Sequence, residues 1–62
     1  MLTKREKDVL KWLIQGKTNR EIAELLCITT HTVKAHIDHI YEKCNVHSRV
    51  ELAVKAVREN IE

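Results

Sequence analysis

A short motif, Ser or Thr followed three residues later by Glu, occurs at three places in this sequence. In such a capping box the hydroxyl accepts a hydrogen bond from an amide of the first helical turn, and the Glu carboxylate accepts one from the amide of the capping residue. The motif therefore predicts where a helix begins. Its copies start at Thr3, Thr18 and Ser48. A fourth helix start is predicted at Thr29 or Thr30, because threonine is also a good capping residue.

Apolar residues repeat with helical periodicity behind each of these starts. The first helix is predicted over 4–15, with Gly16, the single glycine, as its left-handed cap. Its apolar positions are Val9, Leu10, Leu13 and Ile14. The second helix is predicted over 19–26. Its inner side is expected to consist of Ile22, Ala23, Leu25 and Leu26.

The third helix is predicted over 30–44, with Asn45 ending it. Its apolar stripe is narrow and one-sided, and consists of Val33, Ile37, Ile40, Tyr41 and Cys44. At about 100° per residue, the opposite face is polar and looks outward. That face carries His31, Ala35, Asp38, His39 and Glu42, with Lys34 on its flank. The two large aromatic residues, Trp12 and Tyr41, are assigned to the core or its edge.

The fourth helix is predicted over 49–59. The residues expected to face inward are Val50, Ala53, Val54, Val57 and Ile61. Leu52 and Ala56 then fall on the other side of the helix. They form an apolar pair four residues apart with no partner inside the domain.

With 62 residues, the chain is long enough for a single domain, placed at 1–62. One Gly and no Pro leave too few turn residues for a sandwich or barrel. The fold class predicted is therefore all-α, a four-helix bundle with a central helix-turn-helix. No apolar run approaches the ~20 residues that cross a bilayer, and no export signal is present. We expect a cytoplasmic protein in which Cys27 and Cys44 are free, buried thiols.

Two short helices joined by a tight connection, the second with a polar outer face, are the parts of a helix-turn-helix that binds DNA in the major groove. Helix N-termini bind phosphate through unpaired amides and the positive end of the helix dipole. The starts at 18–20 and 29–32 are therefore predicted phosphate anchors. A net charge of +2 favours an anionic partner only weakly. Periodicity alone leaves open that these residues are only caps and solvated surface.

Several short pieces of sequence together resemble one family. They are Leu2-Thr3-x-Arg5-Glu6, Gly16-x-x-Asn19-x-Glu21-Ile22-Ala23, Thr32-Val33-Lys34-x-His36, Lys43 and Arg49. Over residues 2–58 the chain resembles the DNA-binding domain of LuxR-type (GerE-like) bacterial transcription regulators, a helix-turn-helix fold without a wing. The resemblance implies sequence-specific binding of double-stranded DNA by the third helix and dimerisation by the fourth. It also implies an N-terminal receiver or ligand-binding domain, and contact with RNA polymerase.

The resemblance places Lys34 and Ala35 where the family reaches base edges. Asp38 departs from the polar residue that many relatives carry there, and a carboxylate that accepts from cytosine N4 would alter specificity rather than abolish binding. The predicted base contacts are Lys34, Ala35, Asp38 and His31. The predicted phosphate contacts are Lys17, Thr18, Asn19, Arg20, Thr30, Thr32, His36 and Lys43.

The fourth helix is predicted to dimerise through its face opposite the expected core. The predicted contacts are Leu52, Lys55, Ala56 and Glu59. This patch is well below the roughly 1,000 Å² that a stable interface buries. A homodimer that assembles on a DNA with two half-sites is therefore expected.

Other functions are weighed against DNA regulation. A sigma-factor-like promoter reader shares the helix-turn-helix, and a helical protein-interaction module would dock a partner on the third or fourth helix. A metal cluster drawn from His36, His39, Cys44 and His47 is rejected, because Cys44 lies on the apolar stripe and His39 on the outward face. No catalytic triad or phosphate loop is apparent, so neither an enzyme nor a cofactor is expected.

Overall fold

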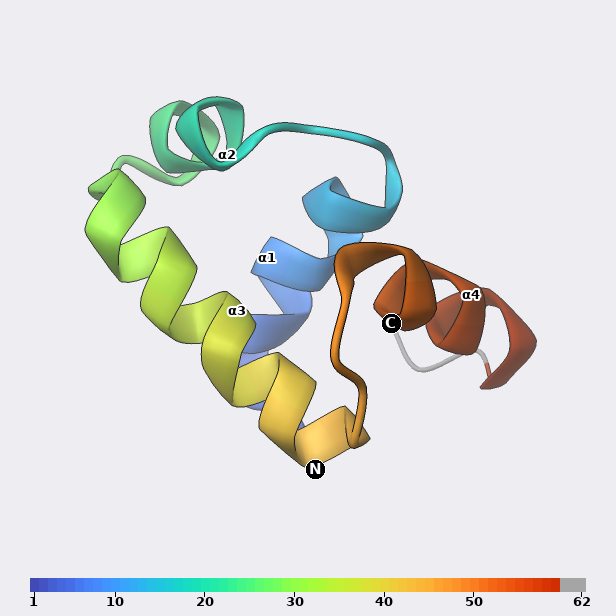
Figure 1. The fold of residues 1–62 in the computed structure, drawn as a ribbon. Coiled ribbons are helices and arrows are strands. Elements are labelled where there is room, and N and C mark those ends of the chain that lie inside the picture. Colours follow the sequence, from blue (N-terminus) through green and yellow to red (C-terminus); the bar gives the residue numbers. More distant parts are fainter. Residues whose placement is uncertain (60–62) are drawn as a thin grey trace.

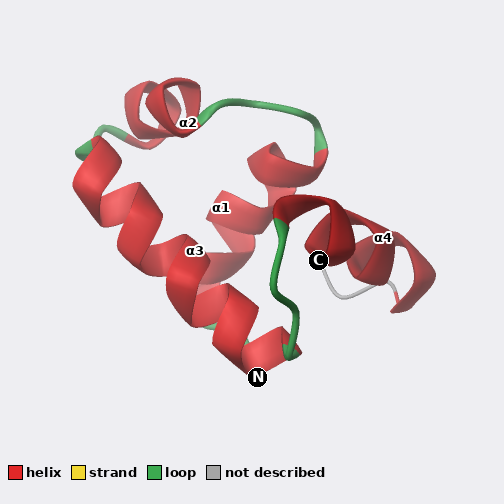
Figure 2. Ribbon diagram, in the orientation of Figure 1, coloured by secondary structure: helices red, strands yellow, loops and turns green. Residues whose placement is uncertain are grey.

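The computed structural model describes residues 1–59, and over this range the chain forms four helices joined by short loops. They are α1 (Lys4–Ile14), α2 (Asn19–Leu26), α3 (Thr30–Cys44) and α4 (Arg49–Glu59). Figure 2 shows helices and loops only in this described part of the chain. The ranges of α2, α3 and α4 coincide with those expected, and α1 ends one residue earlier. Ile61, expected to face inward, lies outside the described residues.

Hydroxyl caps begin all four helices. Thr3 and Thr18 each form the complete reciprocal box, with Glu6 and Glu21 as partners. The Ser48 cap is only half a box: the Glu51 amide donates to Ser48 Oγ over 3.1 Å, but the Glu51 carboxylate accepts from the His47 amide, at 3.0 Å. At α3 the hydroxyl of Thr29 accepts from the Thr32 amide. The positions of the helices are thus set by contacts within a single turn.

Positive backbone φ angles stop three of the helices. Gly16 follows α1 with φ 87°, and Cys27 and Asn45 follow α2 and α3 with φ 57° and 56°. Gly and Asn are the usual residues in this left-handed conformation, whereas a cysteine there is strained. Cys27 is exposed rather than buried as expected, because its place at this cap turns it away from the core; Cys44 is buried.

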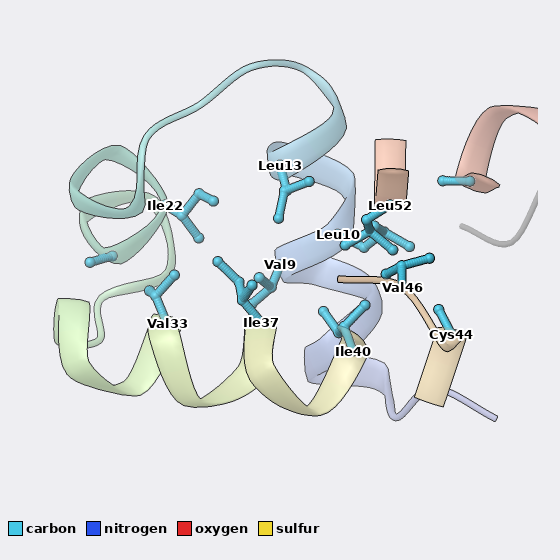
Figure 3. Packing of buried hydrophobic residues seen from close by; sticks show 12 residues of the cluster. Val9, Leu10, Leu13, Ile22, Val33, Ile37, Ile40, Cys44, Val46 and Leu52 are labelled. Carbon is cyan, nitrogen blue, oxygen red and sulfur yellow. The ribbon is translucent and has the colours of Figure 1, made fainter. Parts of the chain in front are cut away.

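The core lies where α1, α2 and α3 meet. Helix α1 packs against all three other helices, and α2 packs across α3 near its N-terminal end (Figure 1). Figure 3 shows the side chains that fill this space. The buried apolar residues are Val9, Leu10, Leu13, Ile22, Ala23, Val33, Ile37, Ile40, Cys44, Val46, Leu52 and Ala56. Trp12 and Tyr41 are partly buried against this cluster, as predicted.

The predicted inward face of α4 is wrong. Leu52 is 0% exposed and Ala56 2% exposed, whereas Val50, Val54 and Val57 are 74%, 49% and 75% exposed. The helix carries two apolar stripes and meets only α1 extensively, so it can bury only one of them. Burying the leucine removes more apolar surface from water than burying a valine, and the small Ala56 lets the helix come close. Leu52 belongs to the same buried cluster as Leu10, and both are labelled in Figure 3.

Leu25 on α2 is a second correction, because it is 49% exposed rather than part of the inner side. With only two turns, α2 presents a narrow stripe to its neighbours. Ile22 and Ala23 fill that stripe and Leu26 is partly buried beside them. Leu25 falls on the flank that no other helix covers.

Candidate nucleic-acid interface

The connection between α2 and α3 is a tight turn closed by backbone hydrogen bonds. The amide of Cys27 donates to the Glu24 carbonyl, and the amide of Ile28 donates to the Ala23 carbonyl over 3.0 Å. Ile28 packs partly buried against the core, so the turn is tied down on its inner side. Helix α3 therefore starts at a fixed angle to α2, which is the arrangement of a helix-turn-helix.

The outer face of α3 is exposed along its length. Val33, Ile37 and Ile40 point into the core. The residues on the opposite side are all exposed, namely His31, Lys34, Ala35, Asp38, His39 and Glu42. The four expected base contacts, His31, Lys34, Ala35 and Asp38, thus share one accessible face. A face of this kind is what an α-helix offers to base edges in the major groove.

Lys34 and Asp38 form an ion pair across one turn of this face. The Lys34 ammonium lies 3.4 Å from Asp38 Oδ2, and the two side chains are 70% and 57% exposed. An ion pair this exposed contributes little to the free energy of folding. Either side chain can therefore leave its partner and bind a ligand instead. The Asp38 carboxylate also offsets the positive charge of Lys34 on the face of α3 that would meet an anion.

The start of α2 gathers a second group of candidates. The hydroxyl of Thr18 accepts from the Glu21 amide at 3.1 Å, whereas the amides of Asn19 and Arg20 have no hydrogen-bond partner among residues 1–59. Arg20 is exposed, and Asn19 is half-buried. The hydrogen bond from the Thr18 amide lowers the pKa of Glu21, so that carboxylate is ionised at neutral pH. This end of α2 thus presents free amides and a guanidinium beside a fixed negative cap.

The candidate phosphate contacts on α3 divide into two locations. Thr30 is exposed in the first turn, and Thr32 and His36 are half-buried nearby. Lys43 lies at the opposite end of the helix, where its ammonium is 2.8 Å from Glu6 Oε1 on α1. Its charge is paired with the buried Glu6 carboxylate, so Lys43 is apart from the other candidates and holds two helices together. The hydrogen bond from Lys43 is the main cause that lowers the pKa of Glu6.

The expected dimer contacts on α4 are not brought together on one surface. Leu52 and Ala56 are in the core and cannot meet a second subunit. Lys55 and Glu59 pair with each other at 3.9 Å, and their side chains are 32% and 57% exposed. The apolar surface of α4 is instead the valine stripe, defined here as Val50, Val54 and Val57, which faces away from α1.

Three long-range contacts, two made by Arg49 and one by Lys43, are not indicated by any local pattern in the sequence. Arg49, the first residue of α4, donates from Nη1 to Asn19 Oδ1 at 3.0 Å and from Nη2 to the carbonyl of Lys17. These partners are 30 and 32 residues away along the chain, so no local pattern relates them. The Glu6 to Lys43 contact spans 37 residues and is hidden for the same reason.

Residues 1–59 carry neither a metal site nor a membrane-spanning helix. No group of three or more His, Cys, Asp or Glu side chains in this range is placed to hold a metal ion. None of the described helices is long and apolar enough to cross a membrane.

Comparison with known proteins points to one family. Residues 1–56 match the family described as bacterial regulatory proteins, luxR family. The chain is 48% identical over 60 residues to the transcriptional regulatory protein LiaR of Bacillus subtilis (strain 168), covering 97% of this chain and 28% of LiaR. It is equally similar, with the same coverage, to the nitrate/nitrite response regulator protein NarL of Escherichia coli (strain K12). The chain thus spans little more than a quarter of these relatives.

Two solved structures share the fold. The response regulator ChrA of a heme-sensing two-component system superposes with a TM-score of 0.94 and 37% identity, over 100% of this chain and 31% of that one. The DNA-binding domain of the response regulator ComA, solved in complex with the anti-activator RapF, gives a TM-score of 0.87 and 36% identity, over 90% and 97% of the two chains.

Proposed function

The chain belongs to the LuxR family of bacterial regulatory proteins as a helix-turn-helix DNA-binding domain, and we propose that it binds a specific duplex by laying the outer face of α3 in the major groove. The observation that carries this proposal is the shared exposed face of His31, Lys34, Ala35 and Asp38. These side chains supply donors, an acceptor and a methyl group, which are the groups that distinguish base pairs in the major groove. We propose that it acts with the chromosome, in the cytoplasm.

Backbone phosphates are proposed to anchor the domain on either side of the groove. The open N-terminus of α2, with Lys17, Thr18, Asn19 and Arg20, is one anchor, and Thr30, Thr32 and His36 at the start of α3 are the other. Free amides and the helix dipole favour an anion at both places. Lys43 is left out of this set, because its ammonium is paired with Glu6.

Dimerisation is proposed to use the valine stripe of α4 rather than Leu52 and Ala56. A two-fold axis near Val54 would place Val50 of one copy against Val57 of the other. Glu51 and Arg58, which flank the stripe on one side, would then face each other with opposite charge, as a self-complementary interface requires. Lys55 and Glu59 remain candidates for its rim. Three valines bury too little for a stable dimer in solution, so DNA with two half-sites is expected to assemble it.

The domain is further proposed to act at the end of a longer regulator. LiaR and NarL are each more than three times as long as this chain. An N-terminal receiver or ligand-binding domain would supply the signal, and contact with RNA polymerase would supply the transcriptional output. No catalytic step is required of the residues described.

Selection of bound duplexes from a random pool tests the function directly. We expect enrichment of a sequence with two half-sites spaced by about one helical turn, or a multiple of it. Affinity for the selected duplex is then measured by fluorescence anisotropy between 50 and 200 mM salt. With 6–10 phosphate contacts the affinity should fall about 10³- to 10⁵-fold over this range. No enrichment, or binding that is insensitive to salt, would favour a protein-interaction module instead.

A further inference from the structure

Arg49 links two helices that have different roles in the proposed function, namely α4 in dimerisation and α2 in binding phosphate. It is the first residue of α4, and its guanidinium reaches the carbonyl of Lys17 and the side chain of Asn19 at the start of α2. Helix α4 otherwise packs mainly on α1. The half-buried Arg49 therefore ties the start of the dimerisation helix to the start of the phosphate-anchoring helix.

The chemistry of this contact determines which way the Asn19 amide points. A guanidinium has five donors and no acceptor, so the atom of Asn19 that faces Arg49 must be the carbonyl oxygen Oδ1. The distance from Arg49 Nη1 to that oxygen is 3.0 Å. The nitrogen Nδ2, with both of its hydrogens, is then directed away from Arg49.

The surroundings of Asn19 make this orientation useful for binding an anion. The amides of Asn19 and Arg20 lack a partner among the residues described, and Arg20 is exposed beside them. If the side chain were reversed, Oδ1 would face this group of donors and would repel a phosphate oxygen. With Oδ1 held by Arg49, every polar group that Asn19 presents to the open end of α2 is a donor.

We propose that Arg49 is a positioning residue for DNA binding, which holds the Asn19 amide with its donor nitrogen toward a backbone phosphate. The inference rests on the proposed function. Arg49 itself does not contact the DNA but acts through Asn19. Because Asn19 would meet the sugar-phosphate backbone, its orientation affects all duplexes alike rather than one sequence.

Two substitutions separate the parts of this proposal. Asn19→Asp keeps an acceptor for Arg49 but replaces the donor nitrogen by an oxygen. Arg49→Lys keeps the positive charge but loses the fork that reaches both acceptors. Arg5→Lys, on the exposed surface of α1, is the matched control for the same change elsewhere. Binding of the 62-residue chain to a duplex with one half-site is measured, so that dimerisation does not enter.

Both substitutions should weaken binding to the selected and to an unrelated duplex by about tenfold, since one charge-assisted hydrogen bond is lost. Arg5→Lys should leave binding unchanged. The decisive comparison adds Arg49→Lys to Asn19→Ala. If Arg49 acts through Asn19, the double variant binds no worse than Asn19→Ala alone.

Several results would overturn the inference while leaving the DNA-binding function intact. The first is unchanged DNA binding by a folded Asn19→Asp variant. The second is a double variant whose loss of affinity is the product of the two single losses. The third is an Arg49→Lys variant that shows no helix by circular dichroism at any temperature. The last would make Arg49 a folding residue only. If the unsubstituted chain binds no duplex under any condition, the proposed function and this inference fall together.

Discussion

The ammonium of Lys43 and the amide of Thr3 both donate to the same oxygen of Glu6, over 2.8 and 2.9 Å. One carboxylate thereby completes the cap of α1 and joins that helix to the last turn of α3. The Glu6 side chain is 5% exposed and that of Lys43 is 37% exposed, so solvent screens the contact only in part. This contact therefore adds to the apolar core in holding α3 against α1.

Acid should weaken the fold through Glu6. The hydrogen bond from Lys43, and next the one from the Thr3 amide, lower the pKa of Glu6 below its ordinary value of 4.5. A lowered pKa means that the stabilisation is complete above pH 4.5 and is lost as the pH falls through the lower, folded-state value. In urea titrations, Glu6→Gln should reduce stability at pH 7 by about 1–2 kcal/mol and flatten the decline below pH 4.5.

Asp8→Asn is the control for this prediction, because Asp8 lies 4.0 Å from Arg5 in an exposed pair that contributes little. A pH profile of Glu6→Gln that parallels that of the unsubstituted chain would show that Glu6 is not the group responsible.

Leu52 should be a residue of the core and not of an interface. Leu52→Ala removes a fully buried side chain and leaves a cavity, so we expect a loss of about 2–5 kcal/mol in the free energy of unfolding. Val57→Ala, on the exposed valine stripe of the same helix, should change that free energy by less than about 0.5 kcal/mol. Thermal melts followed by circular dichroism measure both, and equal losses would contradict the orientation of α4 described here.

Cooperative binding to paired half-sites should depend on Val54. Val54→Glu places two carboxylates near each other across the proposed two-fold axis while the buried side of α4 is unchanged. Gel-shift titrations should show normal occupancy of one half-site and loss of cooperativity on two. Glu24→Gln, an exposed change on α2, serves as the control. Retained cooperativity in Val54→Glu would remove the valine stripe from the dimer interface.

The base preference of the domain should depend on the side chains of Lys34 and Asp38. Lys34→Ala should weaken binding to the selected duplex by about 1–3 kcal/mol and relax the preference at one half-site position, because a lysine can donate to guanine O6 and N7. Asp38→Asn should instead raise affinity for unrelated duplexes, since it removes a negative charge from the DNA-facing helix and releases Lys34, and it should relax the preference at the base that the carboxylate contacts. Selection with each variant measures both effects, and an unchanged preference in Lys34→Ala would reassign that lysine to a phosphate.

Much of the fold was predictable because the interactions responsible act within one or two turns. The hydroxyls of Thr3, Thr18 and Thr29 bind amides three residues away, and Gly16 and Asn45 end their helices through their own backbone angles. The stripe of Val33, Ile37 and Ile40 leaves α3 a single apolar side, so its outer face follows from periodicity alone. The location of the candidate recognition surface can therefore be predicted from the local sequence pattern.

The orientation of α4 was decided by packing. Leu52 and Val54 belong to two different apolar stripes of this helix, and both stripes have helical periodicity, so the sequence alone does not say which one is buried. Contact with α1 selected the stripe that buries the larger side chain. The partners of Lys43 and Arg49 likewise lie at least 30 residues away in sequence, at Glu6 and Asn19. Such pairs form only when the helices have docked, since a charged side chain takes the acceptor that the tertiary fold brings within reach.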